Sequence, residues 1–137
     1  MSDNPDLDAA RELYAAFAVH DGAGIRAALH DDFRGEATPG LPIGAGKHAG
    51  PQAMFAECWG PVFGTFDIAP FPDELIATRD GRVVALGHYR GTARESGRDL
   101  DAVFVHVLRF RDGKVVDLIQ ITDSQRWVEA LEPVPAA

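Results

Sequence analysis

At 137 residues, 46% hydrophobic and 25% charged, the chain fits one globular domain spanning 1–137 that buries a core of its own. The formal net charge of −8 argues against nucleic acid or an anionic membrane as a partner, and no stretch approaches the roughly 20 apolar residues of a membrane span. The single cysteine excludes an internal disulfide, and the acidic, polar start is unlike a signal peptide, so we expect a cytoplasmic protein.

The start of the sequence predicts helices. Asn4 and Pro5 form a favourable cap and first-turn pair, and apolar residues recur at helical spacing over 7–18. The residues 20–22, His-Asp-Gly, predict the end of this helix, and 25–29 predicts a short second one.

The next segments predict an irregular region between two ordered ones. Residues 31–36 predict a brief extended segment, and the glycine- and proline-rich stretch 38–50 predicts an ordered loop near the mouth of a cavity. Pro51 begins a third predicted helix, which Gly60-Pro61 is expected to kink or break.

The second half of the sequence predicts an antiparallel sheet. Turn-forming residues separate the extended runs, and Asp123 or Ser124 caps a short last helix. Helices followed by strands indicate an α+β domain. The predicted strands are 68–78, 82–93, 100–111 and 114–122.

The last two strands carry most of the information, because their pairing decides where His106 and Gln120 point. A two-residue Asp112-Gly113 turn would pair Arg111 with Lys114 and leave His106 beside Ile119. A bulged three-residue turn would instead pair His106 with Leu118 and Phe104 with Gln120.

We prefer the bulged register because it sorts the side chains better. One face then collects Phe104, His106, Leu108, Phe110, Val116, Leu118, Gln120 and Thr122. The other collects Val103, Val105, Val107, Arg109, Val115, Asp117, Ile119 and Ile121. Both faces are largely apolar, and a chain of this size has no second layer to spare, so we expect a homodimer through the sheet face.

Several short segments stand in an informative order along the chain: 14–17, 30–33, 39–42 continuing through Gly46 and Gly50, 87–91, 104–115 and 120–123. In this order they resemble the SnoaL-like, ketosteroid-isomerase-related branch of the nuclear-transport-factor-two-like superfamily. This resemblance implies a curved antiparallel sheet wrapped on the N-terminal helices into a cone, with an internal apolar pocket and often a dimer.

The catalytic residues of these relatives transfer incompletely. By position, His106 matches the oxyanion-donor aspartate of ketosteroid isomerases, and their general-base aspartate falls on Ala37, beside Glu36. Their first-helix tyrosine falls within one residue of Tyr14. The acid/base aspartate of SnoaL-type cyclases falls on Gln120. A glutamine takes up no proton near pH 7, so neither mechanism transfers intact.

Two interpretations of His106 remain open: a pocket histidine that polarises a ligand oxygen, and a core histidine satisfied by Tyr14, Gln120 or a backbone carbonyl. The candidate catalytic residues are His106, Glu36 and Tyr14, and the candidate ligand-binding residues are Gln120, Trp59, Phe63, Phe104 and Leu118.

Other candidates are weaker. His88 and Tyr89 lie on opposite faces of one strand, and parity alone does not choose which faces the cavity. The scattered histidines have no metal-ligand spacing, so neither a metal nor another cofactor is expected.

The leading hypothesis is a cofactor-independent enzyme or accessory protein that binds, and isomerises, cyclises or hydrates, a small, mostly apolar carbonyl, enol or epoxide compound. In it His106 polarises the oxygen, Gln120 orients it, and Glu36 or Tyr14 handles the proton. The alternative is a non-catalytic, small-molecule-binding homodimer. A third option is a protein-interaction module that uses the sheet face.

Overall fold

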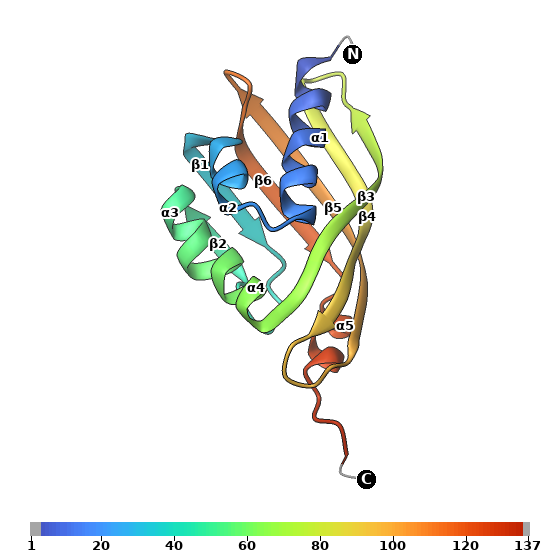
Figure 1. Cartoon of the computed structure of the whole chain (residues 1–137). Helices are drawn as coiled ribbons and strands as arrows, with labels where there is room; N and C mark the ends of the chain where they lie inside the picture. The colour runs from blue at the N-terminus through green and yellow to red at the C-terminus, as the bar shows by residue number, and fades with distance from the viewer. Residues whose placement is uncertain (1–3, 136–137) are drawn as a thin grey trace.

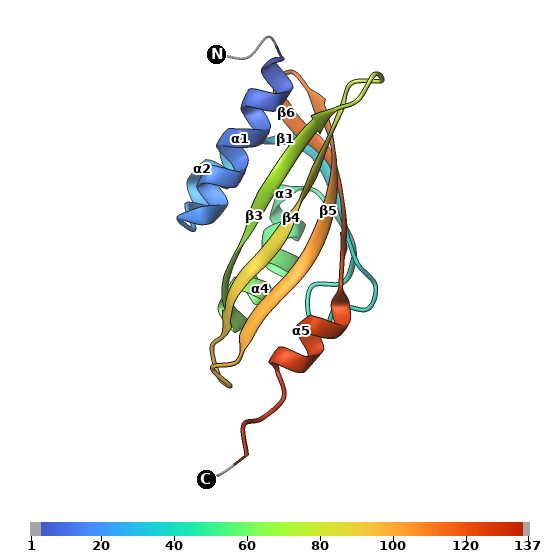
Figure 2. The ribbon, with the colours of Figure 1, turned by 90° about the vertical axis from the view of Figure 1, so that its right-hand side faces the viewer.

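The computed structural model describes residues 4–135. A curved sheet wraps around the helices, which lie mainly on its concave side, with the C-terminal helix at one end (Figures 1 and 2). The elements are α1 Pro5–Ala18, α2 Gly22–Ala27, β1 Leu29–Ala37, β2 Gly46–Ala49, α3 Pro51–Met54, the π-helical turn η1 Phe55–Trp59, α4 Gly60–Thr65, β3 Phe66–Ala77, β4 Arg82–Ala93, β5 Asp99–Arg111, β6 Lys114–Thr122 and α5 Ser124–Ala130.

The six strands are ordered β2-β1-β6-β5-β4-β3. All neighbouring strands are antiparallel except β1 and β6, which run parallel. The expected α+β cone is confirmed, with that one parallel pair as an addition. The expected loop 38–50 also contains the short edge strand β2, which the glycine content concealed.

The N-terminal helix begins as predicted. The Asn4 side chain accepts hydrogen bonds from the backbone amides of Asp6 and Leu7, at 2.9 and 3.2 Å. One face of α1 then packs into the core through Ala10, Leu13, Tyr14 and Phe17. The apolar spacing therefore determines which way Tyr14 points.

The helical segment 51–65 continues across Gly60-Pro61 through a π-helical turn. Proline lacks an N–H and its ring collides with the carbonyl four residues earlier, which would break a regular helix. Here the turn widens, and the Gly60 amide bonds the Phe55 carbonyl five residues back. A β-carbon on Gly60 would collide with that same carbonyl oxygen. The wide turn brings Cys58 and Trp59 into the core.

The β5–β6 hairpin follows neither predicted register along its whole length. Arg111 pairs with Lys114 at the turn, but a bulge in β6 then shifts the pairing, so that His106 lies opposite Gln120 and Phe104 opposite Thr122. The preferred register is therefore wrong by two residues, which leaves most side chains on their predicted faces. Val115 is the exception, because the bulge turns it into the core.

The two faces of the sheet differ in how far the rest of the chain covers them. The inner face packs against the helices, whereas Val103, Ile119 and Ile121 on the outer face are 53%, 43% and 58% exposed. Among residues 4–135, no helix has both the length and the apolar character required to cross a membrane.

Candidate functional site

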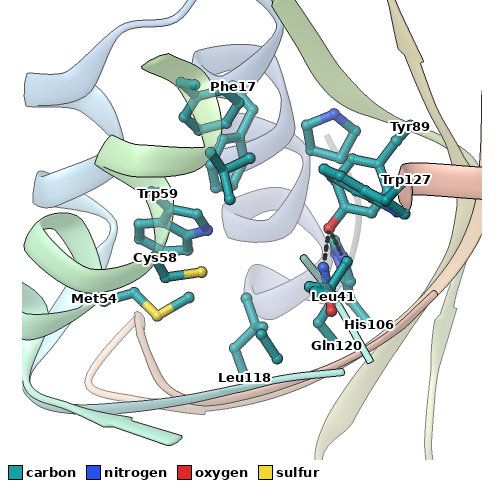
Figure 3. Close-up of a pocket in the computed structure, with 14 residues that line it drawn as sticks. Phe17, Leu41, Met54, Cys58, Trp59, Tyr89, His106, Leu118, Gln120 and Trp127 are labelled. Carbon is teal, nitrogen blue, oxygen red and sulfur yellow. Dashed lines mark hydrogen bonds between the residues drawn. The ribbon is translucent and has the colours of Figure 1, made fainter. Parts of the chain in front are cut away.

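An enclosed pocket lies between the concave face of the sheet and the helices, and most of its wall is apolar or aromatic (Figure 3). Phe17 comes from α1, Trp59 from η1 and Phe63 from α4, while Tyr89, His106 and Gln120 come from the central strands. The free space at its centre is only about 30 Å³, roughly the room that one or two water molecules need.

A chain of hydrogen bonds crosses the strand side of this pocket. The Tyr14 hydroxyl lies 2.7 Å from Nδ1 of His106, and the Tyr89 hydroxyl lies 2.8 Å from its Nε2. The side-chain amide of Gln120 donates to the Tyr89 hydroxyl at 3.0 Å. Both bonds to Tyr89 are visible in Figure 3. The chain therefore links α1, β5, β4 and β6.

Thr38, which follows β1, determines which way the Gln120 amide faces. The Thr38 backbone N–H donates to Oε1 of Gln120 at 3.0 Å, so this atom is the carbonyl oxygen and the amide nitrogen must face Tyr89. The Thr38 hydroxyl lies 3.0 Å from the Gln120 backbone carbonyl and 3.1 Å from Oε1. The backbone N–H of Thr122 donates to this hydroxyl at 3.0 Å.

Burial keeps the groups of this chain neutral near pH 7. Loss of solvation lowers the pKa of His106 to about 3 and raises the pKa values of Tyr14 and Tyr89 well above the ordinary value for tyrosine. His106 therefore has one N–H donor and one bare nitrogen acceptor. The site is a network of neutral donors and acceptors without a charged group.

The structure brings most of the predicted site residues to the pocket. Those that line it are Trp59, Phe63, His106, Leu118 and Gln120. Tyr14 reaches the site through its hydrogen bond to His106 instead of lining the pocket. Phe104 stacks on the His106 ring, with ring centroids 4.1 Å apart, and so supports the imidazole from one side.

Glu36 lies elsewhere. It lines a groove on the outer face of the sheet, together with Arg34, Lys47 and Arg109. The geometry does not bring this carboxylate to the interior pocket, because β1 presents the neighbouring Ala37 to that side.

The question left open between His88 and Tyr89 is resolved in favour of Tyr89. His88 points outward, with Nδ1 2.6 Å from Oδ1 of Asp101, whereas Tyr89 is buried. Trp127 and Leu41 also line the pocket and were missed.

Hydrogen bonds hold both ends of the loop that carries Leu41 in place. Thr38 holds one end to Gln120, as described above. Near the other end, the buried ring of His48 lies 2.9 Å from the Gly44 carbonyl through Nε2 and 2.8 Å from Oε1 of Glu57 through Nδ1. The sequence predicted an ordered loop at the cavity mouth, and Leu41 does form part of the pocket wall.

Other reactive groups near the pocket are inert or dispersed. Burial raises the pKa of the Cys58 thiol to about 12, so it stays protonated near neutral pH. Within the described part of the chain, no cluster of three or more histidine, cysteine, aspartate or glutamate side chains is placed to hold a metal ion.

This cone-shaped α+β fold recurs in solved structures. A nuclear-transport-factor-two-like protein of unknown function from Burkholderia pseudomallei is 32% identical, with a TM-score of 0.84, and the match covers 96% of this chain and 98% of that one. A second nuclear-transport-factor-two-like protein, from Burkholderia thailandensis, is 25% identical, with a TM-score of 0.83 over 96% and 100% of the two chains.

A third similar structure is TerC, crystallised with polyporic acid, which is 25% identical with a TM-score of 0.81 over 93% of this chain and 98% of TerC. No curated protein sequence matches the chain. The sequence profile of the SnoaL-like domain matches residues 10–118. The chain therefore belongs to the SnoaL-like domain family.

Proposed function

We propose that this protein binds a small, mostly apolar molecule through a carbonyl, enol or epoxide oxygen in the interior pocket. The observation that carries this proposal is the Gln120–Tyr89–His106–Tyr14 chain, buried except for the partly exposed Gln120, which is the main polar feature of an otherwise apolar wall. Ligand pockets generally combine apolar walls with a few placed polar groups. The co-crystal of the similar protein TerC with polyporic acid supports a small-molecule ligand.

Binding is favoured over proton transfer as the primary role. Within the described residues 4–135, the side chains that line the pocket include no carboxylate. His106, with a pKa of about 3 and both ring nitrogens engaged, is poorly placed to act as a general base or acid. If the protein isomerises, cyclises or hydrates its ligand, the hydrogen-bond network would act by polarising the ligand oxygen.

Ligand entry requires the pocket to widen. A free space of about 30 Å³ is far below the roughly 300 Å³ or more of typical ligand sites. The loop with Leu41 and the wide turn η1 form part of the wall, and both are irregular segments whose displacement leaves the sheet intact. We expect the pocket to open at this loop.

The bicyclic ketone 1-tetralone and its hydrocarbon analogue tetralin test the proposal. We expect the wild-type protein to bind the ketone about 2- to 12-fold more tightly, the equivalent of one net hydrogen bond of about 0.5–1.5 kcal/mol. In Tyr89→Phe, calorimetric titration should give nearly equal affinities for the two compounds, and the affinity for tetralin should match that of the wild type. An undiminished ketone preference in Tyr89→Phe would contradict the assignment, as would equal affinities in the wild type.

The proposal includes a cytoplasmic homodimer in which the outer faces of two sheets pack together. Val103, Ile119 and Ile121 form an exposed apolar strip across β5 and β6, with the partly buried Val105 and Val107 beside them. Contiguous exposed apolar surface of this kind usually marks an interaction site. Two identical strips related by a two-fold axis would cover each other.

Sedimentation equilibrium tests the dimer. We expect twice the chain mass for the wild type and a shift toward one chain mass for Ile121→Lys, which places a charge in the middle of the strip. Val19→Lys is the matched control, because Val19 is 75% exposed but lies at the end of α1, away from the outer sheet face, and it should remain dimeric. A wild-type protein that sediments as a single chain at all concentrations would rule out the dimer.

A further inference from the structure

The hydrogen-bonding hydrogens of Tyr14, His106 and Tyr89 can be counted. Tyr14 and Tyr89 each carry one hydroxyl hydrogen, and neutral His106 carries one N–H, which makes three hydrogens for the two contacts between these side chains. One tyrosine must therefore donate to the bare ring nitrogen, while the other accepts from the ring N–H and keeps its own hydrogen spare. The tautomer of His106 determines which tyrosine has the spare hydrogen.

The surroundings of the two tyrosines are unequal. Tyr14 does not line the pocket, and within residues 4–135 the structure records no polar partner for its hydroxyl other than His106. Tyr89 lines the pocket, where the free space accommodates a water molecule or a ligand atom. A spare hydrogen on Tyr14 would be buried without an acceptor, whereas one on Tyr89 faces a space in which an acceptor fits.

We infer that Tyr14 fixes the proton of His106 on Nε2, so that Tyr89 turns its hydroxyl hydrogen into the pocket and makes the site select hydrogen-bond acceptors. Tyr14 donates to Nδ1, Nε2–H donates to Tyr89, and Tyr89 donates to the ligand. Tyr14 is thus a positioning residue. This inference rests on the proposed function and narrows its ligand class to ketones, ethers and epoxides.

The same arrangement disfavours hydroxyl ligands such as enols and phenols. The Tyr89 oxygen already accepts from His106 and from Gln120, and Thr38 holds the Gln120 amide in the orientation that makes it a donor. Both acceptor sites of the oxygen are therefore filled. A ligand hydroxyl hydrogen placed against Tyr89 would find no acceptor there.

Two-bond proton–nitrogen correlation spectra of the histidine rings test the tautomer in the ligand-free protein. We expect the His106 signals, assigned by their absence in His106→Gln, to show a protonated Nε2 and a bare Nδ1. A protonated Nδ1 would overturn the inference. Because this spectrum requires no ligand, its outcome is independent of whether the proposed function is correct.

Ligand selectivity is the second measurement. We expect 5,6,7,8-tetrahydro-1-naphthol to bind about tenfold more weakly than 1-tetralone, because a buried donor without a partner is costly. In Tyr14→Phe either tautomer leaves one ring nitrogen unpaired, so the share of Nδ1–H should rise and the preference for the ketone should fall.

The outcomes separate the two proposals. If 1-tetralone binds but the phenol binds equally well, the acceptor selectivity is wrong while the proposed function stands. If Tyr14→Phe changes neither the tautomer nor the selectivity, Tyr14 has no positioning role. If 1-tetralone shows no advantage over tetralin in the wild type, the proposed function is wrong, whatever the tautomer of His106.

Discussion

Between pH 7 and pH 5, the free energy of unfolding of the wild-type protein should fall by about 2 kcal/mol more than that of His106→Gln. Burial lowers the pKa of His106 to about 3, whereas in the unfolded chain its pKa is about 6.5. As the pH falls through about 6.5, the unfolded chain takes up a proton that the folded protein does not. The contribution is therefore fully present above pH 6.5 and is lost progressively toward pH 3, at about 1.4 kcal/mol per pH unit.

Urea titrations at half-unit intervals between pH 5 and pH 7.5 measure this difference. Every other ionisable group is present in both proteins, so the difference between the two curves isolates His106. Glutamine keeps a donor and an acceptor between the two tyrosines but does not titrate. The variant will also be less stable at pH 7, since its amide cannot reproduce the ring geometry. Parallel curves for the two proteins would show that His106 is solvated or charged in the folded state.

The faces of the β5–β6 hairpin were predictable from the sequence, but its register was not. Side chains alternate between the two faces of a strand, so a shift of the pairing by two residues leaves each side chain on the same face. The predicted pairing of His106 was wrong by two residues, and His106 and Gln120 therefore still lie on the predicted face. The bulge that inverts Val115 and Val116 has no local sequence signal, because both residues are valines. Both valines are buried, and only the packing of the whole sheet decides that Val115 is the one that joins the hydrophobic core.

The site was predictable residue by residue but not as a network. His106 and Gln120 were identified because polar residues stand out in apolar strands. Tyr89 and Thr38 were not, since their roles depend on contacts across three strands and on the position where β1 ends. Of the two interpretations of His106, the contacts show the core histidine, which is bonded by Tyr14 and Tyr89. Its ring also lines the pocket, so the role toward a ligand oxygen stays a proposal.

Leu118→Ala should cost about 2–5 kcal/mol of unfolding free energy and should make the pocket a better site for 1-tetralone. Leu118 is 4% exposed and forms part of the pocket wall on β6. Truncation of a buried leucine removes its transfer free energy and leaves a cavity. Here that cavity joins a space of about 30 Å³, so the ligand has to displace less of the wall to enter. A ligand at 100 times its Kd would raise the free energy of unfolding of the variant by about 2.7 kcal/mol, which is comparable with the stability that the truncation removes.

Leu29→Ala is the matched control. Leu29 is fully buried at the start of β1 and does not line the pocket, so the same truncation should cost a similar free energy of unfolding. A bicyclic ketone is too large for the space that a single leucine leaves, and 1-tetralone should stabilise this variant no more than it stabilises the wild type. Thermal unfolding of the three proteins, with and without the ketone, makes the comparison. Equal stabilisation of both variants would place the ligand outside the pocket, because of these two leucines Leu118 lines the pocket and Leu29 does not.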